Sequence, residues 1–505
     1  MKKLRLLFVL LWMTSNLFSS PVTGLLERID KGASSKFIIE RQKSGTDFFE
    51  LDQKGDKVII RGNDYVNIAT GLNWYLKYYA GIHLSWNGMT AKLPAVLPPV
   101  TKKERHETDL PYRYDLNYCT FSYSMAFWDW ERWEKEIDWM ALHGINLSLA
   151  LTGTESVWRN VLLKLGYTKD EINEFVAGPG FTAWWLMNNL EGWGGPNPES
   201  WYTRQEKLQK KIVKRMREYG IEPVLPGYCG MVPHNAKEKL GLNVADPGFW
   251  CSYHRPAFLQ PEDERFEEIS ALYYRELTKL YGKTGFYAID PFHEGGSTQG
   301  VNLDAAGKAI MKAMKKTNPD AVWVAQAWQD NPRTSMIEHL EAGDLLVLDL
   351  HSECRPQWGD PASEWCRKGG YGQHGWVYCM LLNFGGNIGL HGKMDALING
   401  FYDAKTDNHA GKTLCGVGMT PEGIENNPVM YELVMELPWR EHRFTRDEWL
   451  KGYVYARYGV EDEALQQAWD LLGNGIYNSP KEKIQQGTHE SVFLSLIHIS
   501  EPTRP

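Results

Sequence analysis

Two glutamates each follow a short apolar run and are each followed by glycine. Glu294 lies in His293-Glu294-Gly295, and Glu422 lies in Pro421-Glu422-Gly423. Paired carboxyl groups are what glycoside hydrolysis needs, because one donates a proton to the leaving oxygen while the other attacks carbon or activates water. A following glycine lets substrate and backbone approach closely. Glu294 and Glu422 are therefore the best candidates for a catalytic pair.

Four other carboxylates also follow strand-like runs and remain rivals for these roles: Glu155, Asp290, Asp349 and Glu425. Asp290 immediately precedes a proline turn, which favours a supporting hydrogen-bonding role. The sequence shows no Ser/His pair for nucleophilic attack. No Cys/His spacing matches a zinc site, and no His-Glu-x-x-His motif occurs, so we expect neither a metal nor another cofactor.

The elements that must position these residues recur as eight strand-like runs separated by helical or loop sequence. Several runs are almost continuously apolar, as expected for parallel strands covered on both faces. This alternation predicts a (β/α)₈ barrel over residues 109–440, with the active site at the carboxyl ends of the strands. A doubly wound open sheet is the alternative, but no Gly-x-Gly-x-x-Gly opens a helix after the first run. The runs are Arg113–Tyr118, Asn146–Leu151, Glu222–Gly227, Phe286–Asp290, Val322–Trp328, Leu345–Leu350, Trp376–Leu381 and Leu414–Met419.

Smaller units are expected on both sides of the barrel. Residues 21–108 read as an N-terminal α+β domain and linker, in which residues 93–108 form the linker because they are rich in Pro, Lys and Glu. Residues 441–493 read as the start of a C-terminal all-helical domain, with helices between Leu450 and Ile476.

The two ends of the chain have unusual composition. Residues 1–20 combine a basic start, a short apolar run and small residues, which predicts a signal peptide; an N-terminal membrane anchor is the alternative. No other apolar stretch reaches the roughly 20 residues of a membrane span. We therefore expect export to a periplasmic, extracellular or lysosome-like compartment.

Residues 494–505 contain LSLIHISEPTR, which resembles a translated sequencing adapter. We expect the natural sequence to stop near Phe493 and the helical domain to be truncated, although a genuine strand-like tail is the alternative.

Composition excludes some classes of protein. Hydrophobic residues make up 43% and charged residues 23%, which excludes wholesale disorder. The net charge of −8 argues against nucleic acid as a partner, since phosphate binding needs a basic surface. The 21 tryptophans suit a large core or aromatic ligand platforms. Seven cysteines are too few for a disulfide scaffold; Cys354 and Cys366 could bridge, but buried thiols are equally compatible.

Several long motifs carry a specific resemblance. From about Leu110 to Trp439, the sequence resembles the α-N-acetylglucosaminidase family, glycoside hydrolase family 89. The matching stretches include Tyr112-Arg113-Tyr114, Asn117-x-Cys119-Thr120, Trp128-Asp129-Trp130-x-Arg132-Trp133-Glu134, Gly144-Ile145-Asn146-Leu147, Asn383-Phe384-Gly385-Gly386-Asn387 and Pro421-Glu422-Gly423-Ile424.

The resemblance implies an enzyme that releases terminal α-linked N-acetylglucosamine from glycans, with retention of configuration through a covalent glycosyl-enzyme. It implies a small N-terminal domain, a barrel and a helical C-terminal domain. It also implies that Glu294 is the acid/base and Glu422 the nucleophile. The expected substrate-binding residues are Asn117, Cys119, Trp193, Trp250, His293, Trp328 and Asn383. His293 departs from the family pattern, because the lysosomal members carry Asn before the acid/base.

Two other functions stay open. A β-hexosaminidase using substrate assistance would usually place adjacent Asp and Glu at one strand end, whereas Asp290 and Glu294 are four residues apart. A non-catalytic glycan-binding protein would not need both Glu294 and Glu422. If the enzyme is retaining, its two carboxyl groups should lie about 5–5.5 Å apart.

Overall fold

Eight parallel strands close into a barrel in the computed structural model, which describes residues 20–387 and 389–480. The predicted barrel is confirmed, and each strand overlaps one of the eight predicted runs. In chain order the strands are β5 (Tyr112–Asp115), β6 (Leu147–Leu149), β7 (Glu222–Pro226), β13 (Phe286–Ala288), β14 (Val322–Ala327), β15 (Leu345–Asp349), β16 (Gly375–Met380) and β17 (Leu414–Met419). The barrel closes where β17 pairs with β5.

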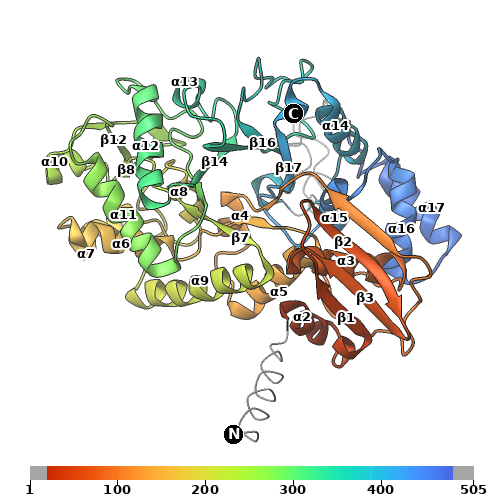
Figure 1. Cartoon of the computed structure of the whole chain (residues 1–505). Coiled ribbons are helices and arrows are strands. Elements are labelled where there is room, and N and C mark those ends of the chain that lie inside the picture. Colours follow the sequence, from red (N-terminus) through yellow and green to blue (C-terminus); the bar gives the residue numbers. More distant parts are fainter. Residues whose placement is uncertain (1–19, 388, 481–505) are drawn as a thin grey trace, which may run out of the picture.

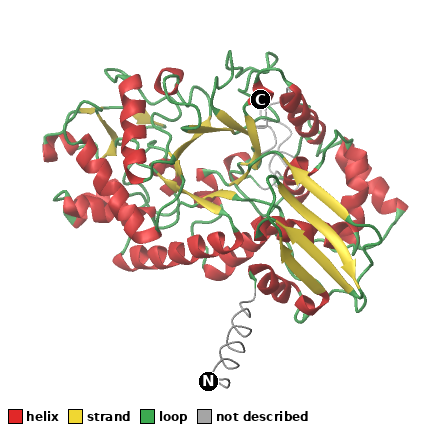
Figure 2. Cartoon of the chain, viewed as in Figure 1, coloured by secondary structure: helices red, strands yellow, loops and turns green. Residues whose placement is uncertain are grey.

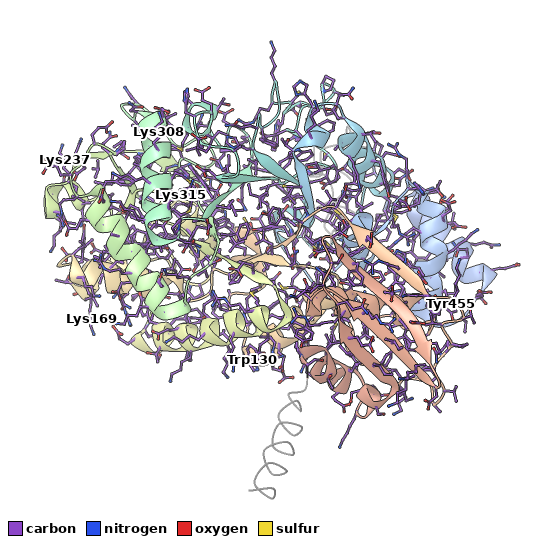
Figure 3. The ribbon with its side chains drawn as sticks, viewed as in Figure 1. Trp130, Lys169, Lys237, Lys308, Lys315 and Tyr455 are labelled. Atoms are coloured by element: carbon purple, nitrogen blue, oxygen red, sulfur yellow. The ribbon has the colours of Figure 1, made fainter. Side chains whose placement is uncertain are left out.

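Helices surround the barrel and explain why its strands are apolar (Figure 2). Every residue of β15 is buried, since helices cover the outside and side chains fill the inside. Figure 3 shows Lys308 and Lys315 on α12, one of these helices. The longer helices are α5 (Trp130–Leu142), α6 (Thr154–Lys164), α9 (Glu199–Tyr219), α11 (Phe266–Tyr281), α12 (Leu303–Thr317), α14 (Met394–Thr406) and α15 (Pro428–Glu436).

Short elements fill the connections at the carboxyl end of the barrel. The helices are α4 (Tyr118–Tyr123), α7 (Lys169–Phe175), α8 (Thr182–Leu186), α10 (Ala236–Leu240) and α13 (Thr334–Ile337). The strands β8 (Met231–Val232), β9 (Val244–Ala245) and β12 (Ala257–Leu259) form one small sheet, and β10 (Phe249–Trp250) pairs with β11 (Tyr253–His254) as a hairpin. Single 3₁₀ turns occur at η1 (Ala33–Lys36), η2 (Phe384–Gly386), η3 (Ala410–Lys412) and η4 (Leu437–Trp439).

An N-terminal sheet and two helices pack beside the barrel (Figure 1). The sheet has the order β1-β3-β2-β4, with β1 (Phe37–Arg41), β2 (Asp47–Lys54), β3 (Lys57–Gly62) and β4 (Glu104–Thr108). The helices are α2 (Pro21–Ile29) and α3 (Tyr65–Tyr78), and α3 contacts both the sheet and α5. The predicted linker is wrong at its end, because β4 pairs with β2. The strand β4 has polar side chains that are alternately exposed, so its composition is like that of a linker.

Two helices follow the barrel, α16 (Arg446–Tyr458) and α17 (Glu463–Asn474), as predicted. The helix α16 packs against α3 and α14. The predicted signal peptide, apart from Ser20, and the predicted adapter-derived tail lie outside the described residues. Within those residues no disulfide forms, so the optional Cys354–Cys366 bridge is not made. None of the described helices has both the length and the apolar character needed to cross a membrane.

Candidate active site

A cavity of about 200 Å³ opens at the carboxyl end of the barrel. Drug-sized ligands occupy pockets of about 300–1,000 Å³, so this cavity suits one smaller molecule, about the size of a monosaccharide. Its walls come from the segments that follow β5, β13, β14, β15, β16 and β17, together with α8 and β10. The lining residues are Asn117, Cys119, Tyr123, Trp184, Met187, Trp250, His293, Glu294, Gln326, Trp328, Leu350, Phe384, Gly385 and Glu422.

Seven of the nine residues predicted for the site line this cavity, including both members of the carboxyl pair. They are Asn117, Cys119, Trp250, His293, Glu294, Trp328 and Glu422. Both candidate carboxyl groups therefore meet at one cavity although 128 residues separate them in the chain. Asn383 and Trp193, both described residues, are not among the lining residues.

Asn383 is buried behind the cavity wall. Its side-chain amide donates to the Gly423 carbonyl oxygen (2.5 Å) and the Tyr431 hydroxyl (2.9 Å). Its own oxygen accepts from Asn427 (3.1 Å). Since Gly423 directly follows Glu422, Asn383 fixes the segment that carries this glutamate.

Trp193 lies at the outer end of a row of aromatic rings that starts inside the cavity. Trp184 and Trp250 line the cavity, with ring centroids 6.2 Å apart. Trp250 stacks on Tyr253 (6.3 Å), and Tyr253 contacts Trp193 (5.0 Å). The Trp193 side chain is about half exposed. Sequence reasoning missed Trp184, for which the only signal is a pair of tryptophans in a short helix.

Hydrogen bonds hold both oxygens of Glu294. Asn189 Nδ2 donates to Oε2 (3.0 Å), and Trp328 Nε1 donates to Oε1 (3.2 Å). The Glu294 backbone is in the left-handed region (φ +48°), which is strained for this residue type and needs external support.

Arg255 supplies that support from below the cavity. It is fully buried and donates to the His293 and Glu294 carbonyl oxygens (2.8 Å each). It also donates to Asn189 Oδ1 (2.9 Å), which directs the Asn189 amide nitrogen toward Glu294. Burial lowers the pKa of Arg255 to about 10, so the guanidinium stays charged near neutral pH. Neither Arg255 nor Asn189 gave a signal in the sequence, because both act from loops far from Glu294 in the chain.

Glu422 has a drier environment. Burial raises its pKa to about 7, the charge of Glu294 adds to this effect, and a hydrogen bond from Gly385 opposes it. The Gly385 backbone N–H donates to Glu422 Oε2 (2.5 Å). Gly385 has φ +65°, a conformation that glycine adopts without strain.

The four rival carboxylates, all described residues, do not line the cavity. Asp290 accepts from the Gln326 N–H (2.7 Å) and from Asn331 (2.8 Å), so it supports the strand ends from below. Asp349 accepts from the Gln357 N–H (2.9 Å) and Glu155 accepts from Trp201 (2.9 Å). Glu425 forms an ion pair with Arg132 (3.0 Å). The geometry thus favours Glu294 and Glu422 over these rivals.

His293 is buried at the cavity, and neither ring nitrogen has a hydrogen-bond partner among the described residues. Burial lowers its pKa, so the ring is neutral near pH 7. A neutral imidazole offers one donor and one acceptor. A polar ligand in this cavity could satisfy both.

Comparison with known proteins matches all three parts of the chain to one family. Residues 113–441 match the family model described as Alpha-N-acetylglucosaminidase (NAGLU) tim-barrel domain. Residues 20–99 match its N-terminal domain and residues 449–496 its C-terminal domain. The human Alpha-N-acetylglucosaminidase is 40% identical over 458 residues, which cover 87% of this chain and 60% of the human protein.

Solved structures give the same result. A family 89 glycoside hydrolase from Clostridium perfringens, in complex with 2-acetamido-1,2-dideoxynojirmycin, has a TM-score of 0.85 and 34% identity. The match covers 92% of this chain and 53% of that one. A double glutamate-to-glutamine variant from the same organism, in complex with its substrate GlcNAc-alpha-1,4-galactose, matches equally well. A β-N-acetylhexosaminidase from Streptomyces coelicolor has a TM-score of 0.54 at 12% identity, a likeness of fold alone.

This chain spans 60% of the length of the human relative and about half that of the Clostridium enzyme. Within that span the barrel match alone covers residues 113–441, more than half of the 505 residues. The resemblance predicted from the sequence is therefore confirmed, and the chain belongs to the α-N-acetylglucosaminidase family, glycoside hydrolase family 89.

Proposed function

We propose that this chain is an exo-acting retaining glycoside hydrolase that releases terminal α-linked N-acetylglucosamine from glycans. The observation that carries the proposal is the meeting of Glu294 and Glu422 in one cavity of about 200 Å³, with Trp250 and Trp328 in its walls. Indole faces suit the C–H face of a sugar ring, and carboxylates and amides suit its hydroxyls. The name of the human relative and the substrate in the Clostridium complex support the choice of sugar.

In the first step, Glu294 donates its proton to the glycosidic oxygen. Glu422 attacks the anomeric carbon, so that a bond from this carbon to the Glu422 carboxylate forms as the glycosidic bond breaks. In the second step, Glu294 removes a proton from water. The water oxygen then bonds to the anomeric carbon, and Glu422 leaves as a carboxylate.

The surroundings of the two carboxyl groups fit these steps. The Gly385 N–H stabilises the charged form of Glu422. Asn189 and Trp328 hold the Glu294 carboxyl in place between the two steps.

The test is turnover of 4-nitrophenyl N-acetyl-α-glucosaminide by the full chain, with the β-anomer alongside. We expect cleavage of the α-anomer only. Glu422→Gln should abolish turnover, and Glu294→Gln should abolish it for unactivated leaving groups. The control Glu425→Gln changes an exposed carboxylate three residues from Glu422 and should retain turnover. NMR of the first sugar released should show the α-anomer.

Other outcomes would overturn the proposal. Cleavage of the β-anomer would indicate the β-hexosaminidase alternative. Binding of N-acetylglucosamine without turnover would indicate a glycan-binding protein. Release of the β-anomer from the α-substrate would refute retention, and normal turnover by Glu422→Gln would remove this residue as nucleophile.

We propose that Trp193, outside the cavity, contacts the leaving-group part of a longer glycan. The aromatic row from Trp184 to Trp193 supports this, since it extends from the cavity to an exposed ring. Trp193→Ala should raise KM several-fold for a GlcNAc-terminated oligosaccharide and leave KM for the aryl glycoside unchanged. Equal effects on both substrates would contradict this role.

We also propose that residues 1–20 direct export, as their composition predicts. Mass measurement of the mature N-terminus tests it: cleavage near residue 20 is expected, and a secreted or periplasmic protein that keeps Met1 would contradict it.

A further inference from the structure

Three potential metal ligands from separate segments converge beside the active-site wall. Glu191 lies in the loop after α8, His234 follows β8, and His254 ends β11. One ligand atom from each side chain lies within 4.8 Å of the others. Since 43 and 20 residues separate them in sequence, no short motif reveals the cluster.

Hydrogen bonds between the three segments build a framework for the cluster. The Glu191 backbone N–H donates to the His254 carbonyl oxygen (3.2 Å), and the His234 N–H donates to Glu191 Oε2 (3.3 Å). The Glu191 side chain is only 5% exposed, whereas the His234 side chain is 52% exposed. The cluster therefore has a buried carboxylate on one side and an entry path from solvent on the other.

The orientation of His254 is fixed in a way that favours metal binding. His254 Nδ1 lies 2.8 Å from the Arg255 carbonyl oxygen. Because a carbonyl oxygen only accepts, Nδ1 must carry the proton, and Nε2 keeps its lone pair. Metal-binding histidines commonly have this arrangement, in which the second ring nitrogen donates to a carbonyl or carboxylate. The His234 ring lies 5.0 Å away, centroid to centroid.

We propose that Glu191, His234 and His254 form a binding site for one Zn²⁺ ion. Two imidazole nitrogens and one carboxylate oxygen suit this ion, with water as the fourth ligand. Ca²⁺ and Mg²⁺ prefer all-oxygen sites and fit less well. The His234–Glu191 ion pair on its own accounts for two members of the cluster. It does not account for the third member, His254, whose ring nitrogen completes the ligand set.

The location gives the ion a structural role. The hairpin β10–β11 carries Trp250 of the cavity wall, and its last residue is the ligand His254. The next residue is Arg255, which holds Asn189 and the backbone of Glu294. Zinc would therefore link the hairpin to the loop that carries Asn189 and Glu191, and would make this wall more rigid without touching the reacting atoms.

Zinc binding to the full chain, first treated with a chelator, tests the proposal. Titration calorimetry should show one equivalent of Zn²⁺ bound. His234→Gln and His254→Gln should each lower the affinity at least tenfold, since even losing a supporting partner of a ligand costs about 10–100-fold. His442→Gln is the control, because His442 is 84% exposed and lies near one carboxylate, and it should bind zinc like the wild type.

A second readout is thermal stability. Saturating Zn²⁺ should raise the Tm of the wild type and of His442→Gln but not of the two ligand variants, because a ligand stabilises only the state that binds it. Bound Co²⁺ should show the d–d absorption of a tetrahedral site.

Two results would overturn the site: no stoichiometric binding by the wild type, or wild-type affinity in His234→Gln. The exposed position of His234 makes this variant safe for folding even if His254→Gln unfolds. Zinc binding is measured without substrate, so its failure leaves the proposed hydrolase activity unaffected, and loss of that activity leaves the metal site unaffected.

Discussion

Glu294 and Glu422 are the same residue type, but their neighbours differ. Both oxygens of Glu294 accept hydrogen bonds, one from Trp328 and one from Asn189, which Arg255 helps to hold. Glu422 has one amide donor and is otherwise desolvated. In the proposed mechanism the role of Glu294 as acid/base rests on the family resemblance and on its hydrogen bonds, because the burial that raises a carboxyl pKa acts on Glu422.

Burial of Glu422 should destabilise the fold at alkaline pH. Its folded pKa of about 7 lies above the ordinary value of 4.5, so the folded state binds the proton more tightly than the unfolded state. Stability is therefore lost as pH rises from about 4.5 through 7. Glu422→Gln should raise the free energy of unfolding at pH 8 by about 1–3 kcal/mol and change it little at pH 4.5.

Urea unfolding at both pH values measures this effect. Glu425→Gln, at an exposed carboxylate, is the control and should show no such pH-dependent gain. Equal effects of Glu422→Gln at pH 4.5 and pH 8 would contradict the raised pKa.

Asn189 should act as a positioning residue for Glu294. Without its amide, the carboxyl loses one of two hydrogen bonds, and small displacements of an acid/base are costly. We expect Asn189→Ala to lower kcat about 10–100-fold for a poor leaving group. Dinitrophenyl glycosides need no acid, so their glycosylation step should change little.

The comparison between the two leaving groups distinguishes positioning from general damage. Asn399→Ala, at an exposed site on α14, should leave both rates unchanged. An equal loss of kcat for both substrates in Asn189→Ala would indicate a merely structural role.

At this scale the sequence predicted residues that follow a barrel strand and missed those that reach the cavity from loops. Asn117, Glu422 and Glu294 follow the ends of β5, β17 and β13 by two, three and six residues, and the carboxyl ends of these strands must meet. Trp184, on the short helix α8, and Arg255, directly after β11, act through contacts between the segments that connect the barrel strands. Such contacts depend on how loops fold over the barrel, and no periodic pattern encodes this.

At the scale of elements, a buried charge cluster joins the N-terminal helix α3 to α15 of the barrel. Lys77 contacts Glu436 (2.5 Å) and Glu432 (3.4 Å), and its side chain is 4% exposed. His83 also pairs with Glu432, and Arg440 with Glu436. Although burial opposes it, the charges of Lys77 and Arg440 lower the pKa of Glu436 to about 2.

Removing the charge of Lys77 should lower the stability of the fold, because two buried carboxylates would lose their shared partner. We expect Lys77→Met to destabilise the protein by about 3 kcal/mol, at the lower end of the range for broken buried pairs because His83 and Arg440 remain. Chemical denaturation measures this. The control Lys451→Met, at an exposed lysine on α16, should change stability by less than about 0.5 kcal/mol. A similarly small effect of Lys77→Met would show that the buried charge cluster contributes little to stability.

The eight barrel strands were predictable because several are almost continuously apolar and they alternate with helical or loop sequence. Strands of two or three residues, such as β8 to β12, are too short for any periodicity to show. The strand β4 was missed for a different reason. It lies at the edge of its sheet with alternate side chains exposed, and its pairing with β2 depends on a partner more than 50 residues away.

At the scale of the whole molecule, buried carboxyl groups and buried histidines shift stability in opposite directions. Burial raises the pKa of Glu155, Asp290 and Asp349 to about 7. Burial lowers the pKa of His143 and His391 to about 4. The carboxyl groups remove stability as pH rises from about 4 to 7, and the histidines restore stability as pH rises from about 4 to 6.5.

Above pH 6.5 the histidine contribution is complete, while the carboxyl groups continue to lose protons. We therefore expect a Tm several degrees lower at pH 8 than at pH 6. Calorimetry at constant ionic strength checks this, and a Tm that rises from pH 6 to pH 8 would contradict it.

The barrel closes by pairing its first strand, β5, with its last strand, β17, so closure must wait until β17 has been synthesised. The ribosome delivers β5 about 300 residues before β17, so at about 5–20 residues per second one side of β5 waits about 15–60 s for its permanent neighbour. Open strand edges pair readily with other chains. Nascent chains of this protein should therefore depend on chaperones until β17 emerges, and slower growth at low temperature should improve the soluble yield.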